Sequence, residues 1–389
     1  MDSKAADRIW GKNDIDLLGM GMEHEWILNG SLADKSMLRN YLSYSIASEF
    51  MEFTPDARYC EVLIRENSEL TYGGVYLLAE TIKVGPDRVN IHKFKPNQLM
   101  NSYLVRRDRI DSQGIMLDTY GRLNGFSSEY IGLEYPSKTL VTEDMIQYVS
   151  KDISEIERVL YAENSKIFEL YQEVIDVDSF IDYFLFNEFF GSYDAGNFST
   201  YAYKDMGGKL HMGPVWDLDS AMDNYYLEPL SEDDLAFQTK PWFDRLCMDK
   251  EFIKKLASRY ANLRRGILSD EHIAEKIDEI VAYLGDAIER EWSRWGDTYT
   301  HEEGYHNLWL QDYETEEGIV LHRNAHRYQD EIYRLKSALA SHASYIYDQI
   351  RIMERSAVFD TGSIRWRGWA LLVVVFLFFV PAIKVVRRK

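Results

Sequence analysis

The stretch that decides the fold runs from residue 194 to residue 219 and reads DAGNFSTYAYKDMGGKLHMGPVWDLD. It holds one polar cluster at each end, with Asp194 and Asn197 in the first and Asp217 and Asp219 in the second. Between them, two short alternating segments around a glycine pair predict a β-hairpin, which brings the two clusters close together. Hard cations such as Mg²⁺ bind carboxylate and amide oxygens, so the stretch predicts a metal site.

An apolar helix is predicted immediately before this stretch. Its apolar residues recur at helical spacing and are Phe180, Ile181, Phe184, Leu185 and Phe189. Asp178 or Ser179 can cap the start of this helix, and Gly191 ends it. The order is then helix, polar loop, hairpin and aspartate, which is the order of a kinase catalytic core from its catalytic loop to its metal-binding aspartate.

Two further blocks accompany this stretch. The first includes LLGM at residues 17–20, EWILNG at residues 25–30, Asp34-Lys35 and Arg39-Asn40. The second is GGVYLLAE at residues 73–80 with RVNI at residues 88–91. Together with the Tyr-Ala-Tyr strand, the glycine turn and PVWD at residues 214–217, these blocks resemble the CotH kinase family, atypical protein kinases first known from bacterial spore coats. The resemblance spans roughly residues 12–300.

The resemblance implies an α+β fold of the atypical protein-kinase type, with a strand-rich small lobe and a mainly helical large lobe. It implies ATP with Mg²⁺ or Mn²⁺ as cofactors and a protein with Ser or Thr acceptors as substrate. Asp194 would act as the catalytic base, and Asp217 would bind the metal, with Asp219 available for a second metal. Either Asn197 or Ser199 would complete the metal site.

The resemblance also implies a phosphate-binding group in the strand-rich lobe. Lys83 and Arg88 would contact phosphates there, and Glu80 would orient one of them. The family usually has a Lys- or Arg-bearing strand pair before the Leu-Leu-Gly block, and this chain begins close to that block. We therefore expect the chain to be an N-terminally shortened version of a longer protein with a reduced phosphotransfer activity.

Composition limits the partners. The chain of 389 residues has 64 acidic and 44 basic side chains and a formal net charge of −20. Such a charge argues against nucleic acid as a partner. Cys60 and Cys247 are the only cysteines, and the sequence leaves their pairing open.

The C-terminal segment predicts a membrane anchor. Residues 369–383 carry no charge, and the apolar segment extended to residue 386 reaches the minimum length needed to cross a bilayer. Arg387, Arg388 and Lys389 follow and should stay in the cytoplasm. We therefore expect a single-pass membrane protein with its large domain outside the cytoplasm.

The sequence divides into five predicted parts. Residues 1–107 form a strand-rich lobe and residues 108–355 a larger helical lobe, followed by a juxtamembrane linker at 356–368, a transmembrane helix at 369–386 and a basic tail at 387–389. In the first lobe, residues 60–64 and 74–81 should pair as strands, and a helix capped by Asp34 or Ser36 should continue to Phe50. Thr142 should open a helix that ends near Tyr161.

Three functions fit these patterns. The first is an ATP-dependent protein Ser/Thr kinase that acts on surface or secreted proteins. The second is a metal-dependent glycosyl or nucleotidyl transferase, because Asp217-Leu-Asp219 is a DxD sequence, although the chain lacks an early Rossmann-like glycine turn. The third is a catalytically degenerate kinase fold that serves as a surface scaffold.

Overall fold

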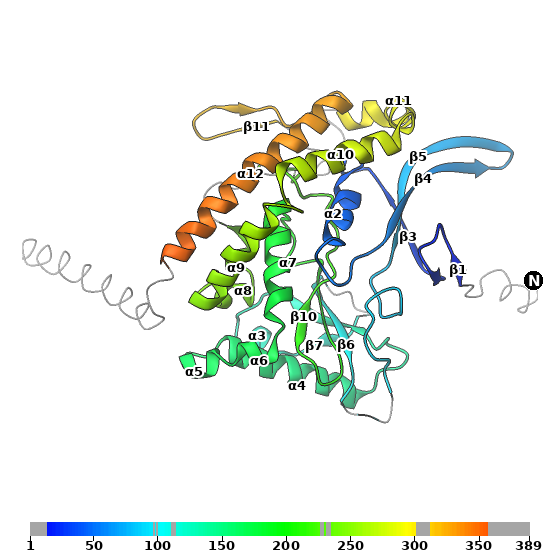
Figure 1. Cartoon of the computed structure of the whole chain (residues 1–389). Helices are drawn as coiled ribbons and strands as arrows, with labels where there is room; N and C mark the ends of the chain where they lie inside the picture. The colour runs from blue at the N-terminus through cyan, green and yellow to red at the C-terminus, as the bar shows by residue number, and fades with distance from the viewer. Residues whose placement is uncertain are drawn as a thin grey trace, which may run out of the picture.

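Two larger antiparallel sheets, two two-stranded ribbons and a group of packed helices make up the described part of this mixed α/β chain (Figure 1). The structure is a computed structural model that describes residues 14–95, 98, 100–109, 114–225, 229–230, 235–300 and 312–356. In Figure 1 the first sheet lies on one side of the molecule, near the N-terminus.

The first sheet has three strands in the order β3-β5-β4. Its strands are β3 (Trp26–Gly30), β4 (Ala57–Glu66) and β5 (Glu69–Glu80). Cys60 pairs with Tyr76 and Val62 with Gly74, which confirms the predicted strand pair. The turn of the β4–β5 hairpin projects away from the rest of the chain (Figure 1). A two-stranded ribbon of β1 (Ile15–Asp16) and β2 (Met22–Glu23) precedes this sheet.

The second sheet has five strands in the order β10-β9-β6-β8-β7. Its strands are β6 (Tyr103–Asp108), β7 (Met116–Leu117), β8 (Tyr130–Tyr135), β9 (Thr200–Lys204) and β10 (Leu210–Met212). The predicted hairpin is confirmed as β9 and β10, with Leu210 opposite Lys204. Because β6 pairs with both β8 and β9, the predicted lobe boundary after residue 107 falls inside a strand of this sheet.

Polar side chains cap three of the helices that precede the hairpin. The helices before the hairpin are α2 (Arg39–Ala47), α3 (Tyr120–Leu123), α4 (Glu143–Leu160), α5 (Ser165–Phe168), α6 (Tyr171–Val174) and α7 (Val177–Phe190). The Thr142 side chain accepts a hydrogen bond from the Met145 N–H, which confirms the predicted start of α4. The predicted cap of α7 was wrong, because Asp176 caps this helix by accepting from the Ser179 N–H.

Helix α7 occupies the core. Most of its residues are buried, including five phenylalanines, because the helix is apolar on all sides. It packs against α9 and α12 and against β10. The later elements are η1 (Ala236–Thr239), α8 (Phe243–Leu246), α9 (Lys250–Leu263), α10 (Asp270–Leu284), α11 (Ala287–Thr300), β11 (Tyr313–Glu314), β12 (Val320–Leu321) and α12 (Tyr328–Ser356).

The other structural predictions concern the thiols and the tail. Cys60 and Cys247 are both free thiols. None of the described helices combines the length and the apolar character that a membrane crossing requires. The predicted transmembrane helix at residues 369–386 and the basic tail lie outside the described residues.

Candidate active site

The loop that carries Asp194 follows directly from the end of α7. Gly191 ends the helix in a left-handed conformation, with φ at 58°. The Asn197 and Phe198 N–H groups both donate to the Asp194 carbonyl oxygen, so the chain turns back tightly after this residue. The loop then enters β9, an inner strand of the second sheet, which places Asp194 shortly before the start of that strand.

Two cations lie beside Asp194. Burial raises the pKa of the Asp194 carboxyl, and attraction from Arg109 and Lys240 opposes this shift. The Arg109 guanidinium lies over the Phe198 ring at 4.0 Å. Gly196 has φ at 91°, and a Cβ atom there would lie 2.6 Å from Cγ of Lys240, so only glycine fits this turn. No sequence motif identified either cation.

Asp217 and Asp219 lie in a bend that follows β10. The strand ends at Met212, and Asp217 adopts φ of 62°, so the pair lies on irregular backbone and not on a regular strand. The Ser199 hydroxyl donates to Oδ2 of Asp217 at 3.4 Å. The Asp217 and Asp219 carboxyl groups lie close enough for each to affect the pKa of the other. The bend therefore keeps both acidic side chains together, as a regular strand would also do for residues two apart.

The two carboxyl groups carry more negative charge than their surroundings compensate. Burial raises the pKa of Asp217, and repulsion from Asp194 and Asp108 adds to the shift. Burial together with repulsion from Asp217 raises the pKa of Asp219 to about 7. Close carboxylates with raised pKa values are stabilised by a bound cation, so this donor set fits a divalent metal.

The aspartates do not all converge on one point. In the part of the chain that the structure describes, one trio of side chains has ligand atoms that all lie within 4.8 Å of one another, namely Asp14, Glu23 and His24. Asp194, Asp217 and Asp219 do not form such a trio. Asp194 is nevertheless close enough to both carboxyl groups for its charge to raise their pKa values. Asn197 is half-buried in the loop beside Asp194.

Helix α2 holds the bend in place. The Leu218 N–H donates to Oδ1 of Asn40 at 2.7 Å. The Trp216 ring stacks on Tyr44 with ring centroids 6.1 Å apart, so Trp216 is a packing residue. These contacts fix the backbone on both sides of the paired carboxylates.

A buried ionic network contacts the backbone directly after the same bend. Arg39 is completely buried and forms ion pairs with Asp34 and Glu331. Its guanidinium also donates to the Ala221 and Met222 carbonyl oxygens. Arg39 and Asp34 both belong to the sequence block near residue 39, where Asp34 was predicted as a helix cap and Arg39 was given no role. The signal for Arg39 is a charged residue at the start of a helix whose other residues are mostly buried.

The predicted phosphate-binding group is only partly assembled. Glu80, at the end of β5, forms an ion pair with Arg88 and also accepts from the Asp56 N–H. These two side chains and Lys83 line one pocket together with Pro214. The Lys83 ammonium, however, pairs with Glu23 at 2.7 Å and with a second glutamate at 3.0 Å.

The family model described as CotH kinase protein matches residues 7–346. The chain belongs to the CotH kinase family. The match includes the Asp194 loop, the β9–β10 hairpin and the Asp217–Asp219 bend, and it indicates a kinase-like function. No curated protein sequence matches this chain.

Proposed function

We propose that this CotH family member is an ATP-dependent protein Ser/Thr kinase with an atypical kinase-like two-lobed fold, acting on surface or secreted proteins. One observation carries the proposal: the paired Asp217 and Asp219 carboxyl groups follow the Asp194 loop across a single hairpin. Phosphoryl transfer needs a bound metal and a carboxylate that positions the attacking hydroxyl, and the three aspartates supply groups for both roles.

In the proposed site, Asp217 and Asp219 would hold Mg²⁺ or Mn²⁺, and Asn197 or Ser199 would complete the ligand set. The metal supplies positive charge that neutralises the ATP phosphates when it is bound. Local cations matter in a chain of net charge −20, because the protein as a whole repels a nucleotide. Arg88, held by Glu80, is the candidate phosphate contact in the strand-rich part, and Lys83 would have to leave its glutamate partners to join it.

Asp194 would orient the acceptor hydroxyl and take its proton. Burial raises the pKa of this carboxyl, which makes it a stronger base than an exposed aspartate. Arg109 and Lys240 keep it ionised, because both cations favour the charged form. A base of this kind is needed only at the acceptor, so its loss should leave nucleotide binding intact.

Two substitutions test the assignment. Asp217→Asn should reduce metal-dependent ATP affinity together with turnover. Asp194→Asn should preserve ATP affinity and lower turnover by roughly 10²–10⁴-fold, the range of a positioned proton acceptor. Calorimetry with ATP and Mg²⁺ or Mn²⁺ and a phosphotransfer assay on a Ser/Thr-rich protein separate the two effects. The control is Asp278→Asn, which removes one negative charge in the same way at an exposed position on α10.

The same measurements distinguish the other functions. Unchanged Mg²⁺-ATP binding by Asp217→Asn would remove the metal assignment. Binding of a UDP-sugar in place of ATP would support a DxD transferase, and the absence of binding to either would support a scaffold without catalysis.

The proposal includes a membrane anchor at residues 369–386, with the large domain outside the cytoplasm. Its support is the sequence pattern of an uncharged segment followed by Arg387, Arg388 and Lys389. The full chain should resist carbonate extraction from membranes, and protease added to spheroplasts should digest its large domain. Extraction by carbonate would reject the anchor, and protection from protease would reject the orientation.

A further inference from the structure

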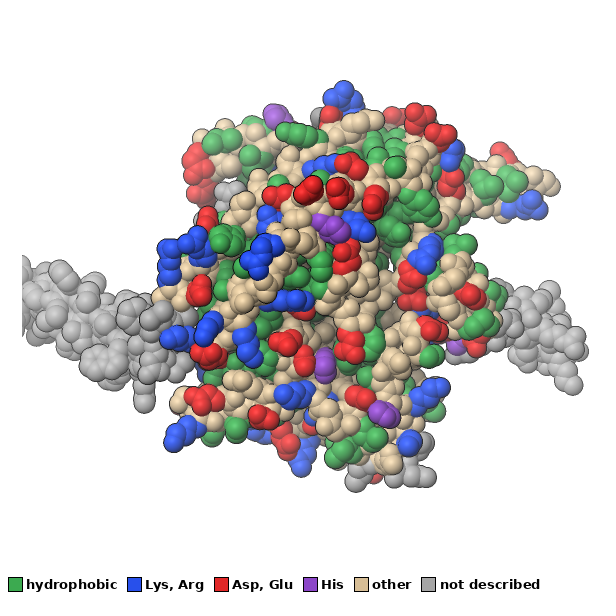
Figure 2. Space-filling view, in the orientation of Figure 1, with side chains coloured by type: hydrophobic (Ala, Val, Ile, Leu, Met, Phe, Trp, Pro, Cys, Tyr) green, Lys and Arg blue, Asp and Glu red, His purple; other side chains and the backbone are tan. Residues whose placement is uncertain are grey.

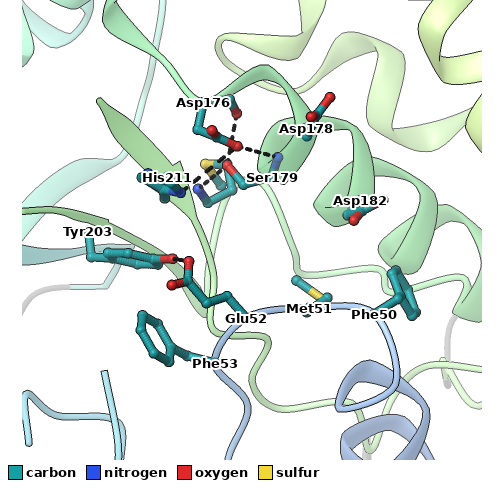
Figure 3. Close-up of a pocket in the computed structure, with 11 residues that line it drawn as sticks. Phe50, Met51, Glu52, Phe53, Asp176, Asp178, Ser179, Asp182, Tyr203 and His211 are labelled. Atoms are coloured by element: carbon teal, nitrogen blue, oxygen red, sulfur yellow. Dashed lines mark hydrogen bonds and ion pairs between the residues drawn. The ribbon is translucent and has the colours of Figure 1, made fainter. Parts of the chain in front are cut away.

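A pocket of about 240 Å³ lies beside the start of α7, away from the aspartates described above (Figure 3). It is formed by the first turns of α7, the β9–β10 hairpin and the loop that follows α2. The side chains that matter for its chemistry are Glu52, Phe53, Asp176, Asp178, Tyr203 and His211. Helix α7 has 14 residues, so its two ends lie roughly 20 Å apart, and the pocket is remote from Asp194 at the other end.

One wall of the pocket is aromatic. The rings of Phe53 and Tyr203 lie 5.2 Å apart, and the His211 ring stacks on Tyr203 at 5.1 Å. Figure 3 shows the Tyr203 hydroxyl directed at Glu52, which accepts its hydrogen bond at 2.7 Å. This wall can cover the hydrocarbon part of a ligand, and its ring faces attract a cation.

The other groups are acidic and only partly neutralised. The charge of Asp182 is neutralised, because Arg259 donates to both carboxylate oxygens at 2.7 and 2.9 Å. The Asp176 carboxylate accepts one hydrogen bond, from the Ser179 N–H, as the cap of α7. Among the residues that the structure describes, Glu52 and Asp178 form no ion pair with a lysine or an arginine, and no such residue lines the pocket.

We infer that this pocket binds an aliphatic ammonium or guanidinium group. Glu52 and Asp178 would receive its charge, and Phe53 and Tyr203 would pack on its stem. The volume is below the roughly 300–1,000 Å³ of sites for drug-sized ligands, so it suits a small polyamine or one basic side chain. This inference is independent of the proposed phosphotransfer, because it uses none of the residues assigned to that reaction.

The test is calorimetry of the full chain with putrescine and spermidine, and with butanediol as an uncharged analogue. The parent should bind both amines and not the diol. The double variant Glu52→Gln/Asp178→Asn should bind the amines about tenfold more weakly or worse, because each change removes an ionic hydrogen-bond acceptor. Both side chains are exposed, so the variant should fold normally.

A matched control is needed because acidic side chains are spread over the molecular surface (Figure 2). Glu66→Gln/Glu69→Gln removes two charges from the exposed turn of the β4–β5 hairpin and should leave amine binding unchanged. Equal losses of amine affinity in both double variants would overturn the inference. Absence of amine binding by the parent would also overturn it, unless a peptide bearing lysine or arginine binds the parent and binding is lost in Glu52→Gln/Asp178→Asn. That last result would identify the ligand as a basic side chain and not a free polyamine.

Discussion

Replacement of Arg39 by methionine tests whether the buried ionic network stabilises the chain and its aspartate bend. Arg39 is 0% exposed, and it pairs with Asp34 and with Glu331, the latter at 2.9 Å. Removing one partner of a buried ion pair leaves the other charges uncompensated and costs about 3–5 kcal/mol. We therefore expect Arg39→Met to lower the free energy of unfolding by about this amount in chemical denaturation.

The matched control is Lys336→Met. Lys336 pairs with Asp278 at 2.6 Å, but the Asp278 side chain is 66% exposed. An exposed pair of this kind contributes about 0–1 kcal/mol, so the control should be nearly neutral. A loss for Arg39→Met that does not exceed the loss for Lys336→Met would refute the reasoning.

The pH dependence gives the same prediction a second test. Burial acts to raise the pKa of Glu331, but attraction from Arg39 and Arg334 outweighs it and holds the pKa below its usual value. A carboxyl of this kind stabilises the fold above its unfolded pKa, and the contribution is lost as the pH falls through its folded pKa. In Arg39→Met the pKa of Glu331 should rise, so the deficit relative to the parent should shrink on acidification from neutral pH. A deficit that is constant with pH would show that Glu331 is not the group left unpaired.

Three further outcomes are expected. Asn40→Leu leaves the buried Leu218 N–H without its acceptor, so the free energy of unfolding should fall by about 1–3 kcal/mol, and metal-dependent ATP affinity should fall with it. Asn40→Asp keeps an acceptor oxygen and should retain most of the stability and the affinity. Equal behaviour of the two variants would contradict the role of Asn40. Burial raises the pKa of Glu188 from 4.5 to about 8, so the stability that its protonated form provides is lost as the pH rises through about 8. Glu188→Gln should remove this decline when the free energy of unfolding is measured over a pH series. An unchanged pH slope in the variant would contradict the role of Glu188. Gly196→Ala should cost about 1–3 kcal/mol and displace Lys240 from the Asp194 loop, and a crystal structure with Lys240 in place would contradict the proposed packing.

The sequence predicted the parts of the fold that depend on neighbouring residues. Thr142 at the start of α4 and the alternating strands at residues 60–64 and 74–81 are local signals, and the structure confirms both. The cap of α7 failed because several acidic and hydroxyl residues stand in a row at 176, 178 and 179, and the sequence alone does not rank them. Tertiary contact with β10 decides the start, since the Asp176 N–H donates to the Leu210 carbonyl oxygen.

The candidate site was predictable only where its residues are close in sequence. The hairpin brings the regions of Asp194 and Asp217 together, and a resemblance of ordered motifs identified both. Lys240 and Arg109 were missed because they come from distant segments that local periodicity does not connect. The pairing of β6 with β9 was missed for the same reason, since nothing near residue 105 specifies a partner near residue 202.

The ion pair between Arg39 and Glu331 joins residues 292 positions apart, and this has a consequence for synthesis on the ribosome. When the segment with Asp217 and Asp219 leaves the exit tunnel, Arg39 and Asp34 are already present, but the glutamate on α12 has not yet been translated. The arginine then has one carboxylate in place of two. Because domains fold as translation proceeds, we expect the bend to settle late, after α12 emerges, and the nascent chain to lack metal affinity until that moment.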